Sequence, residues 1–230
     1  MKRIFLRLIA LFFIALISCS AFSADEAEKK SLNVIHFKSA FLTNYLLRGL
    51  PVIGEHPTIT LNAEYDFSRR FYAGSWLGFP FNTNLLAPQM DLYFGYVYRF
   101  LGLYWDSGFI RYDVIDNARF PVSTEFFTVA HLEEMEFSFF WSAENESAYY
   151  FNVLKEHQIN ERYVLAVDVG YWLKASEANA VNGEVNNATN FSLKAKRLLS
   201  ADKTLFIAWH NQHESGFSNQ YWLAGFEFEL

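Results

Sequence analysis

The stretch that decides the fold is residues 90–100, which read Met-Asp-Leu-Tyr-Phe-Gly-Tyr-Val-Tyr-Arg-Phe. Every second residue is large and apolar or aromatic, whereas the residues between them include Asp91, Gly95 and Arg99. Successive side chains of a β-strand point to opposite faces. Alternation sustained over this whole stretch therefore predicts a strand with one apolar face and one polar face.

The same alternation recurs from Leu32 to the end of the chain. It predicts about twelve strands, at 33–43, 57–67, 70–79, 90–100, 103–113, 123–132, 134–142, 147–156, 162–174, 188–199, 203–210 and 220–230. The segments 103–113 and 147–156 are the weakest, because both of their faces mix aromatic and polar residues. Strands of soluble proteins are usually about five or six residues long, whereas a tilted strand needs about ten to cross a membrane.

The composition agrees with a β-rich membrane protein. Of the 230 residues, 52% are hydrophobic and 19% aromatic, and only 19% are charged, against about 25% in soluble domains. This much apolar surface excludes intrinsic disorder. No apolar run beyond the N-terminus is long enough for a membrane-spanning helix. A single cysteine excludes a disulfide framework.

Aromatic residues lie at both ends of the predicted apolar faces. Tyr163 and Tyr171 share a face and are separated by a height of about 20 Å in a tilted strand, close to the apolar band of an outer-membrane barrel. Tyrosine collects at membrane interfaces because one end of its ring is apolar and the other polar. We therefore predict an all-β fold, a transmembrane antiparallel up-and-down β-barrel. A β-sandwich, whose strands also alternate, is the alternative.

The predicted connections alternate in length. Long polar segments follow the odd-numbered strands, at 44–56, 80–89, 114–122, 143–146, 175–187 and 211–219, and turns of a few residues follow most even-numbered ones. Bacterial outer-membrane barrels combine an even strand number with short periplasmic turns and longer external loops. This alternation favours the barrel.

The N-terminus predicts export. Residues 1–23 have a basic start, a short apolar core and small residues before a cleavage point, which is typical of a signal peptide. Acylation at Cys19 is the alternative. We expect a solvated tail at 24–31, the barrel at 32–230 and a location in the bacterial outer membrane.

The predicted partners follow from charge and from the last strand. Removal of residues 1–23 takes away three of the 19 basic residues and no acid, so 16 basic and 25 acidic residues remain, a net charge of −9. Nucleic acid is therefore not an expected partner. The aromatic alternation of residues 222–230 resembles the C-terminal signal read by the barrel-assembly machinery. Outer-membrane lipid and small solutes or ions are the other expected partners.

Four short motifs, in order, resemble the TorF family of porins. Residues 43–49 (TNYLLRG) are similar to a segment near the start of that family, and 71–76 (FYAGSW) to one of its strands. Residues 90–96 (MDLYFGY) and 105–109 (WDSGF) resemble two further motifs. The resemblance implies a porin-like barrel and singles out Tyr45, Arg48 and Gly49 in the first long loop. Residues 50–52 (LPV) depart from the polar residues usual in the family at that point.

The polar faces predict a lumen lined by both signs of charge. Charges opposite a lipid-facing stripe must meet water or pair with each other. The predicted lumen-lining residues are Lys38, Glu64, Asp66, Asp91, Arg99, Glu125, Glu136, Arg162, Asp168, Lys174, Lys194 and Glu227. They favour a narrow passive channel for ions or small polar solutes. A closed barrel with a structural or receptor role, plugged by Trp76, Tyr93 and Trp172, is the first alternative.

A lipid-modifying enzyme is the second alternative. It would use His210, His213 and Ser215, which we expect instead to be polar residues of an exposed loop. A serine nucleophile needs a positioned base, and no GxSxG elbow is present. The histidines have no metal-ligand spacing beyond His210-x-x-His213. We predict no catalytic, cofactor-binding or metal-binding residues.

Overall fold

The structure is a computed structural model that describes residues 33–48, 56–81, 88–114, 123–142, 149–173, 188–214 and 217–230. The predicted signal peptide at 1–23 and the tail at 24–31 lie outside the described residues. Among the described residues, no helix is long and apolar enough to cross a membrane.

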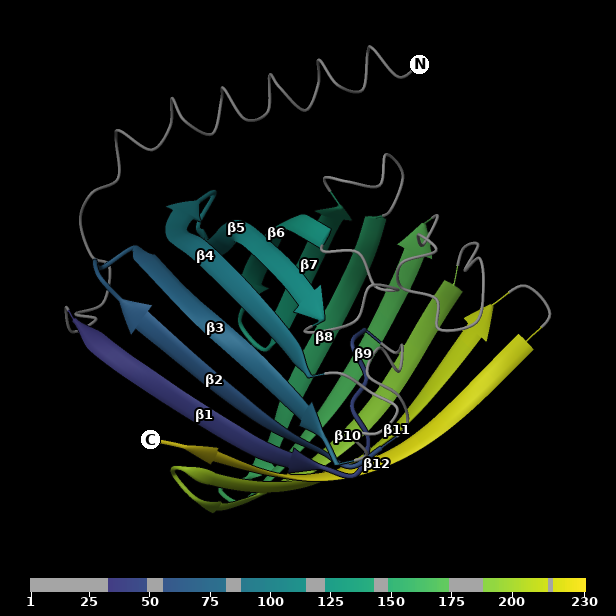
Figure 1. Cartoon of the computed structure of the whole chain (residues 1–230). Coiled ribbons are helices and arrows are strands. Elements are labelled where there is room, and N and C mark those ends of the chain that lie inside the picture. Colours follow the sequence, from purple (N-terminus) through teal and green to yellow (C-terminus); the bar gives the residue numbers. More distant parts are fainter. Residues whose placement is uncertain are drawn as a thin grey trace.

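Twelve antiparallel strands form one closed barrel, in which each strand pairs with its neighbours in sequence and β1 pairs with β12 (Figure 1). The strands are β1 (Val34–Leu42), β2 (Thr58–Asp66), β3 (Phe71–Pro80), β4 (Gln89–Phe100), β5 (Leu103–Val114), β6 (Ser123–Leu132), β7 (Met135–Ser142), β8 (Tyr149–Asn160), β9 (Tyr163–Leu173), β10 (Ala188–Ser200), β11 (Lys203–Glu214) and β12 (Phe217–Glu229). The predicted all-β, up-and-down barrel of twelve strands is confirmed.

The two ends of the barrel differ. The connections after the odd-numbered strands, five of which have six residues or more, share one end, which we call the long-loop end. The connections after the even-numbered strands have two to four residues and share the short-turn end. Leu101 (φ 53°) and Gly102 (φ 80°) make the two-residue turn between β4 and β5. Positive φ at both positions matches the type I′ turn, whose twist suits a β-hairpin.

Two predicted boundaries are wrong, for reasons that lie in pairing between strands. β11 continues to Glu214, so His210 and His213 belong to a strand and not to a loop. Both of them pair with β12, His213 opposite Ser218. The pairs near this end are mostly polar on both faces, so they carry no apolar alternation. Ser215 lies outside the described residues.

Arg162 is the second correction, since it lies in the exposed turn between β8 and β9 and not on the barrel wall. The Oδ1 atom of Asn160 accepts hydrogen bonds from the backbone N–H of Arg162 at 2.9 Å and of Tyr163 at 3.1 Å. An asparagine that bonds its own following backbone in this way favours a turn. β8 therefore extends to Asn160, beyond the predicted end at residue 156.

The seam between β1 and β12 is shorter than the other pairings. Lys38–Leu42 pair with Gly225–Glu229, whereas β12 pairs with β11 along its whole length. After Leu42 the chain leaves the wall, and Thr43 makes the last contacts with β12. Its backbone N–H donates to the Ala224 carbonyl at 2.9 Å, and its Oγ1 accepts from the Ala224 N–H at 2.8 Å.

Candidate functional site

The polar faces of the strands line the inside of the barrel. Ten of the predicted lumen residues lie on this inner face, and several are almost completely buried, with Asp66 1%, Glu125 4% and Asp91 6% exposed. The ten are Lys38, Glu64, Asp66, Asp91, Arg99, Glu125, Glu136, Asp168, Lys194 and Glu227. Lys174 lies outside the described residues, and Arg162 lies in a turn.

Four further charged residues on the inner face were missed by the sequence reasoning: Asp106, Glu156, Lys196 and Glu229. Asp106 and Glu156 belong to the two strands whose alternation was weakest. The register assigns the face of Asp106, which lies opposite Val97 of β4 and Val129 of β6. No signal within the strand itself could have done so.

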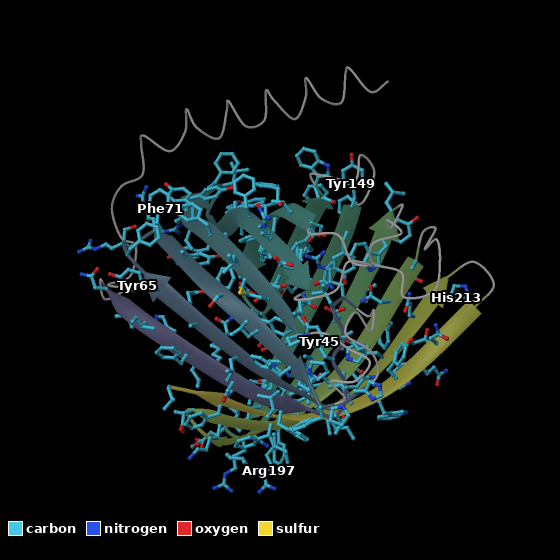
Figure 2. All side chains as sticks on the ribbon, viewed as in Figure 1. Tyr45, Tyr65, Phe71, Tyr149, Arg197 and His213 are labelled. Atoms are coloured by element: carbon cyan, nitrogen blue, oxygen red, sulfur yellow. The ribbon has the colours of Figure 1, made fainter. Side chains whose placement is uncertain are left out.

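The outer face is mostly apolar and rich in aromatic residues, with Lys155 of β8 as a charged exception. Large side chains there remain exposed in the isolated chain, among them Phe37 (49%), Phe109 (56%) and Val169 (51%). Tyr65 and Phe71 lie at the short-turn end, and Tyr149 and His213 lie at the long-loop end (Figure 2). This is the distribution that a lipid-facing surface requires.

Two inward tyrosines lie flat against the wall. The ring of Tyr93 lies over Gly74, and that of Tyr72 over Gly95, so that a Cβ atom at either glycine would overlap the tyrosine ring. Each tyrosine ring can therefore lie against the wall only because the residue on the neighbouring strand is glycine. Tyr93 was one of the residues expected to plug the lumen. Its ring follows the wall instead of pointing across the lumen.

The segment 43–48, which we call the inward loop, enters the barrel from the long-loop end. Tyr45 is seen inside the outline of the barrel, away from either rim (Figure 2), and its ring lies 4.8 Å from that of Trp76. Leu46 packs on an apolar patch of the inner face made by Phe206, Ala208 and Leu223. Burial of these side chains holds the loop against β11 and β12. Burial also raises the pKa of Tyr45, so its hydroxyl stays neutral.

Arg48 extends from the inward loop to the wall formed by β5 to β9. Its Nη2 atom lies 2.7 Å from the Glu125 carboxylate and donates to the Tyr112 hydroxyl at 2.8 Å. The guanidinium lies 3.7 Å from the centre of the Phe140 ring. Only 9% of the side chain is exposed. Burial acts to lower the pKa of Arg48, but Tyr112 and Glu125 outweigh this and raise it, so the group stays charged.

The Arg48 backbone is also tied to the wall. Trp172 donates a hydrogen bond from its indole Nε1 to the Arg48 carbonyl at 3.3 Å. Arg48 has a φ of 51°, a conformation that is uncommon outside glycine and persists where surrounding contacts hold it. The inward loop therefore crosses the lumen as an anchored strap. Of the three residues that the motif singled out, Tyr45 and Arg48 lie in the lumen, and Gly49 is outside the described residues.

On the inner wall from β2 to β5, carboxylate side chains accept hydrogen bonds from uncharged tyrosine hydroxyls and a glutamine amide. The Tyr93 hydroxyl lies 2.8 Å from Asn62 and 3.2 Å from Glu64. Tyr72 donates to the Asp106 carboxylate at 2.7 Å. The Asp91 carboxylate accepts from the Gln89 amide at 2.8 Å. These bonds orient the carboxylates.

A cavity of about 400 Å³ lies on the other side of the lumen, next to Arg48. Its lining includes Arg48, Asn152, Asp168, Asn190, Lys194 and His210. The Asp168 carboxylate accepts hydrogen bonds from the amides of Asn152 at 2.7 Å and Asn190 at 3.3 Å. Lys194 lies over the Phe206 ring, 4.5 Å from its centre. Lys196 and Glu156 form an ion pair at one end of the cavity.

The charges in this lumen are dispersed along the wall. Within the described ranges, no three His, Cys, Asp or Glu side chains converge as a metal site requires. His210, now placed on the inner face of β11, lies opposite Ser192 and Tyr221, and neither pairing supplies an acid that could orient it as a catalytic base.

Comparison with known proteins shows the fold. No family model and no curated protein matches the chain. Among solved structures, a NanC porin matches with a TM-score of 0.58 and 9% identity, over 86% of this chain and 100% of that one. A KdgM porin matches with a TM-score of 0.55 and 10% identity, over 84% and 98%. The COG4313 outer-membrane channel from Pseudomonas putida F1 matches with a TM-score of 0.52 and 10% identity, over 90% and 98%. The chain thus has the fold of these outer-membrane barrels.

Proposed function

We propose that this protein is a bacterial outer-membrane channel through which ions and small polar solutes diffuse passively. The observation that carries the proposal is the division of the barrel into an apolar, aromatic outer face and an inner face lined by charges of both signs. Charged side chains on the inside of a membrane barrel are stable where water reaches them. The fold shared with the NanC and KdgM porins supports this function.

The inward loop makes the channel narrow. Twelve strands lie between the eight-stranded barrels that side chains fill and the sixteen-stranded porins with a wide pore. Arg48 crosses part of the lumen and is fixed to Glu125, while the Tyr45 ring packs against Trp76 of β3. We therefore expect a small conductance that this strap limits.

The inner charges favour cations. Among the side chains that the structure describes, ten acids face the lumen: Glu64, Asp66, Asp91, Asp106, Glu125, Glu136, Glu156, Asp168, Glu227 and Glu229. Five bases oppose them, Lys38, Arg48, Arg99, Lys194 and Lys196. Acidic linings favour cations. A KdgM porin has been solved with oligogalacturonate, which is a polyanion, and the acid excess here argues against such a solute for this chain.

The proposal includes orientation and assembly. We place the long-loop end outside the cell and the short-turn end in the periplasm, as in other outer-membrane barrels. Residues 1–23 act as the signal peptide, β12 is read by the barrel-assembly machinery, and the outer face contacts outer-membrane lipid. Membership of the TorF family is part of the same proposal and rests on the four motifs.

Single-channel recording in planar bilayers tests the function. We expect discrete openings of small conductance, with a reversal potential under a KCl gradient that shows weak cation preference. The preference should strengthen at low salt, where the Debye length exceeds the value of about 8 Å at physiological ionic strength. A clear anion preference would contradict the charge argument.

A closed barrel is the second candidate, and the buried Arg48–Glu125 pair is the observation that favours it. A strap held by a buried pair could seal the lumen permanently. Complete absence of conductance from folded protein would establish this reading in place of the channel.

A further inference from the structure

We propose that the cavity next to Arg48 binds small zwitterionic solutes, with a carboxylate at Arg48 and an ammonium group at Asp168, as in an α-amino acid. The proposal rests on the proposed channel function and names the solute class that the lumen selects. Three features of the cavity carry it: an unused donor, an acid held by neutral groups, and the size of the space.

The carboxylate end is provided by Arg48. Its Nη2 atom is already used by Glu125 and Tyr112, but Nη1 is buried and has no hydrogen-bond partner among the described residues. A buried donor left without a partner is costly, and a ligand carboxylate would supply an acceptor for it. The guanidinium is held in position by the Phe140 ring and by Glu125. Guanidinium groups bind carboxylates through strong, directed hydrogen bonds.

The ammonium end is provided by Asp168. The amides of Asn152 and Asn190 hold its carboxylate in place, and both are neutral donors. An ionised carboxylate has about four acceptor positions, so two hydrogen bonds leave it able to accept from an ammonium group. Lys194, the nearest base on the neighbouring strand, lies over the Phe206 ring and forms no ion pair within the described residues. Asp168 therefore keeps free acceptor positions on a carboxylate that lines the cavity.

Arg48 and Asp168 line one cavity, together with the two amides that hold the Asp168 carboxylate. Trp172, which bonds the Arg48 carbonyl, and Asp168 lie on the same face of β9. A cavity of about 400 Å³ is within the range of small-molecule sites.

A solute with a single charge fits less well. An anion would meet Arg48 but also Asp168 and Glu156, and a cation would meet Asp168 but also Arg48 and Lys194. Like charges placed together across a binding surface cost free energy and so exclude wrong partners. Only a molecule that carries both charges satisfies both ends of the cavity.

Three matched probes separate these cases: L-serine, which carries both charges, ethanolamine, which lacks the carboxylate, and L-lactate, which lacks the ammonium group. We would titrate each into the folded full-length protein in detergent micelles and measure affinity by saturation-transfer-difference NMR. L-serine should bind at least tenfold more tightly than either single-charge probe. Equal affinities for L-serine and L-lactate, or for L-serine and ethanolamine, would overturn the proposal.

Two variants test which residue binds the carboxylate of the solute and which binds its ammonium group. Asp168→Asn, which leaves the inward loop in place, should reduce L-serine affinity about tenfold and leave L-lactate binding unchanged or tighter. Arg48→Lys, which keeps a cation beside Glu125 but lacks the guanidinium Nη1 donor, should reduce L-serine affinity by a similar factor and leave ethanolamine binding unchanged. Glu64→Gln is the matched control, because it removes an inward charge on β2 that does not line the cavity, and the ratio of L-serine to L-lactate affinity should not change.

The binding measurement does not depend on conductance, so the two proposals fail separately. Selective L-serine binding by a protein without conductance would refute the channel and keep the site. Conductance with no preference among the three probes would refute the site and keep the channel.

Discussion

Replacement of Arg48 by alanine should open the channel. The substitution removes the cation of a pair in which Arg48 is 9% and Glu125 5% exposed, together with the contact between the guanidinium and the Phe140 ring. It also removes the hydrogen bond to Tyr112. The Trp172 bond to the backbone carbonyl and the Leu46 packing remain to hold the strap.

The magnitude follows from the burial of the pair. Breaking a buried ion pair by removing one partner typically costs about 3–5 kcal/mol, because the other charge is left without compensation. Glu125 faces the lumen, where water can reach it once Arg48 is gone, so we expect a value near the lower end, about 3 kcal/mol. This corresponds to a shift of roughly a hundredfold in the ratio of docked to released loop. Channels in which the inward loop is released should show larger or longer openings in single-channel records.

The assay is single-channel recording of Arg48→Ala, Glu125→Ala and the double variant in symmetrical KCl. We expect either single variant to increase the mean conductance, and the double variant to add little, because the two residues act as one pair. Arg48→Ala should also strengthen cation preference, since it removes a positive charge. Arg99→Ala is the control, because Arg99 contacts Tyr104 near the short-turn end. Unchanged conductance in both pair variants would refute the idea that this contact holds the strap.

Two further predictions concern folding in the membrane. Val169 lies on the outer face of β9 between Val153 and Phe191, and its neighbour Asp168 lies on the inner face. Arginine at the lipid midplane costs about 2–4 kcal/mol. Val169→Arg should therefore sharply reduce the folded yield seen as heat-modifiable mobility on gels, whereas Asp168→Asn should fold normally, and similar yields would contradict the face assignment. Deletion of residues 222–230 removes most of β12 and the whole pairing with β1, so the open edge would leave backbone groups unpaired in lipid. Recovery of the truncated protein in outer-membrane fractions should be lost, and normal recovery would show that β12 is not required for closure.

Most of the barrel could be predicted from the sequence. Alternation with a period of two is a local signal, and it assigned both the strands and their faces wherever one face was plainly apolar, as in residues 90–100. The signal failed where both faces were mixed. For Asp106 the face depends on pairing with Val97 and Val129, and for His210 the strand continues because β12 pairs with it.

The candidate site could be predicted only in part. Asp168 and Lys194 could be placed on the inner face from their own strands, but their common cavity depends on Arg48, which comes from the loop after β1. A motif singled out Arg48 without indicating a partner. The contact with Glu125 joins residues 77 positions apart, and no local pattern encodes that distance.

The sequence by itself determined that the chain forms long amphipathic strands with an acidic, polar face, because side-chain direction in a strand depends only on position. The tertiary structure alone decided what fills the lumen. Closure of the barrel brings Phe206, Ala208 and Leu223 together as an apolar patch on an otherwise polar inner face. Burial of Leu46 on that patch turns the loop inward, and only then can Arg48 reach Glu125.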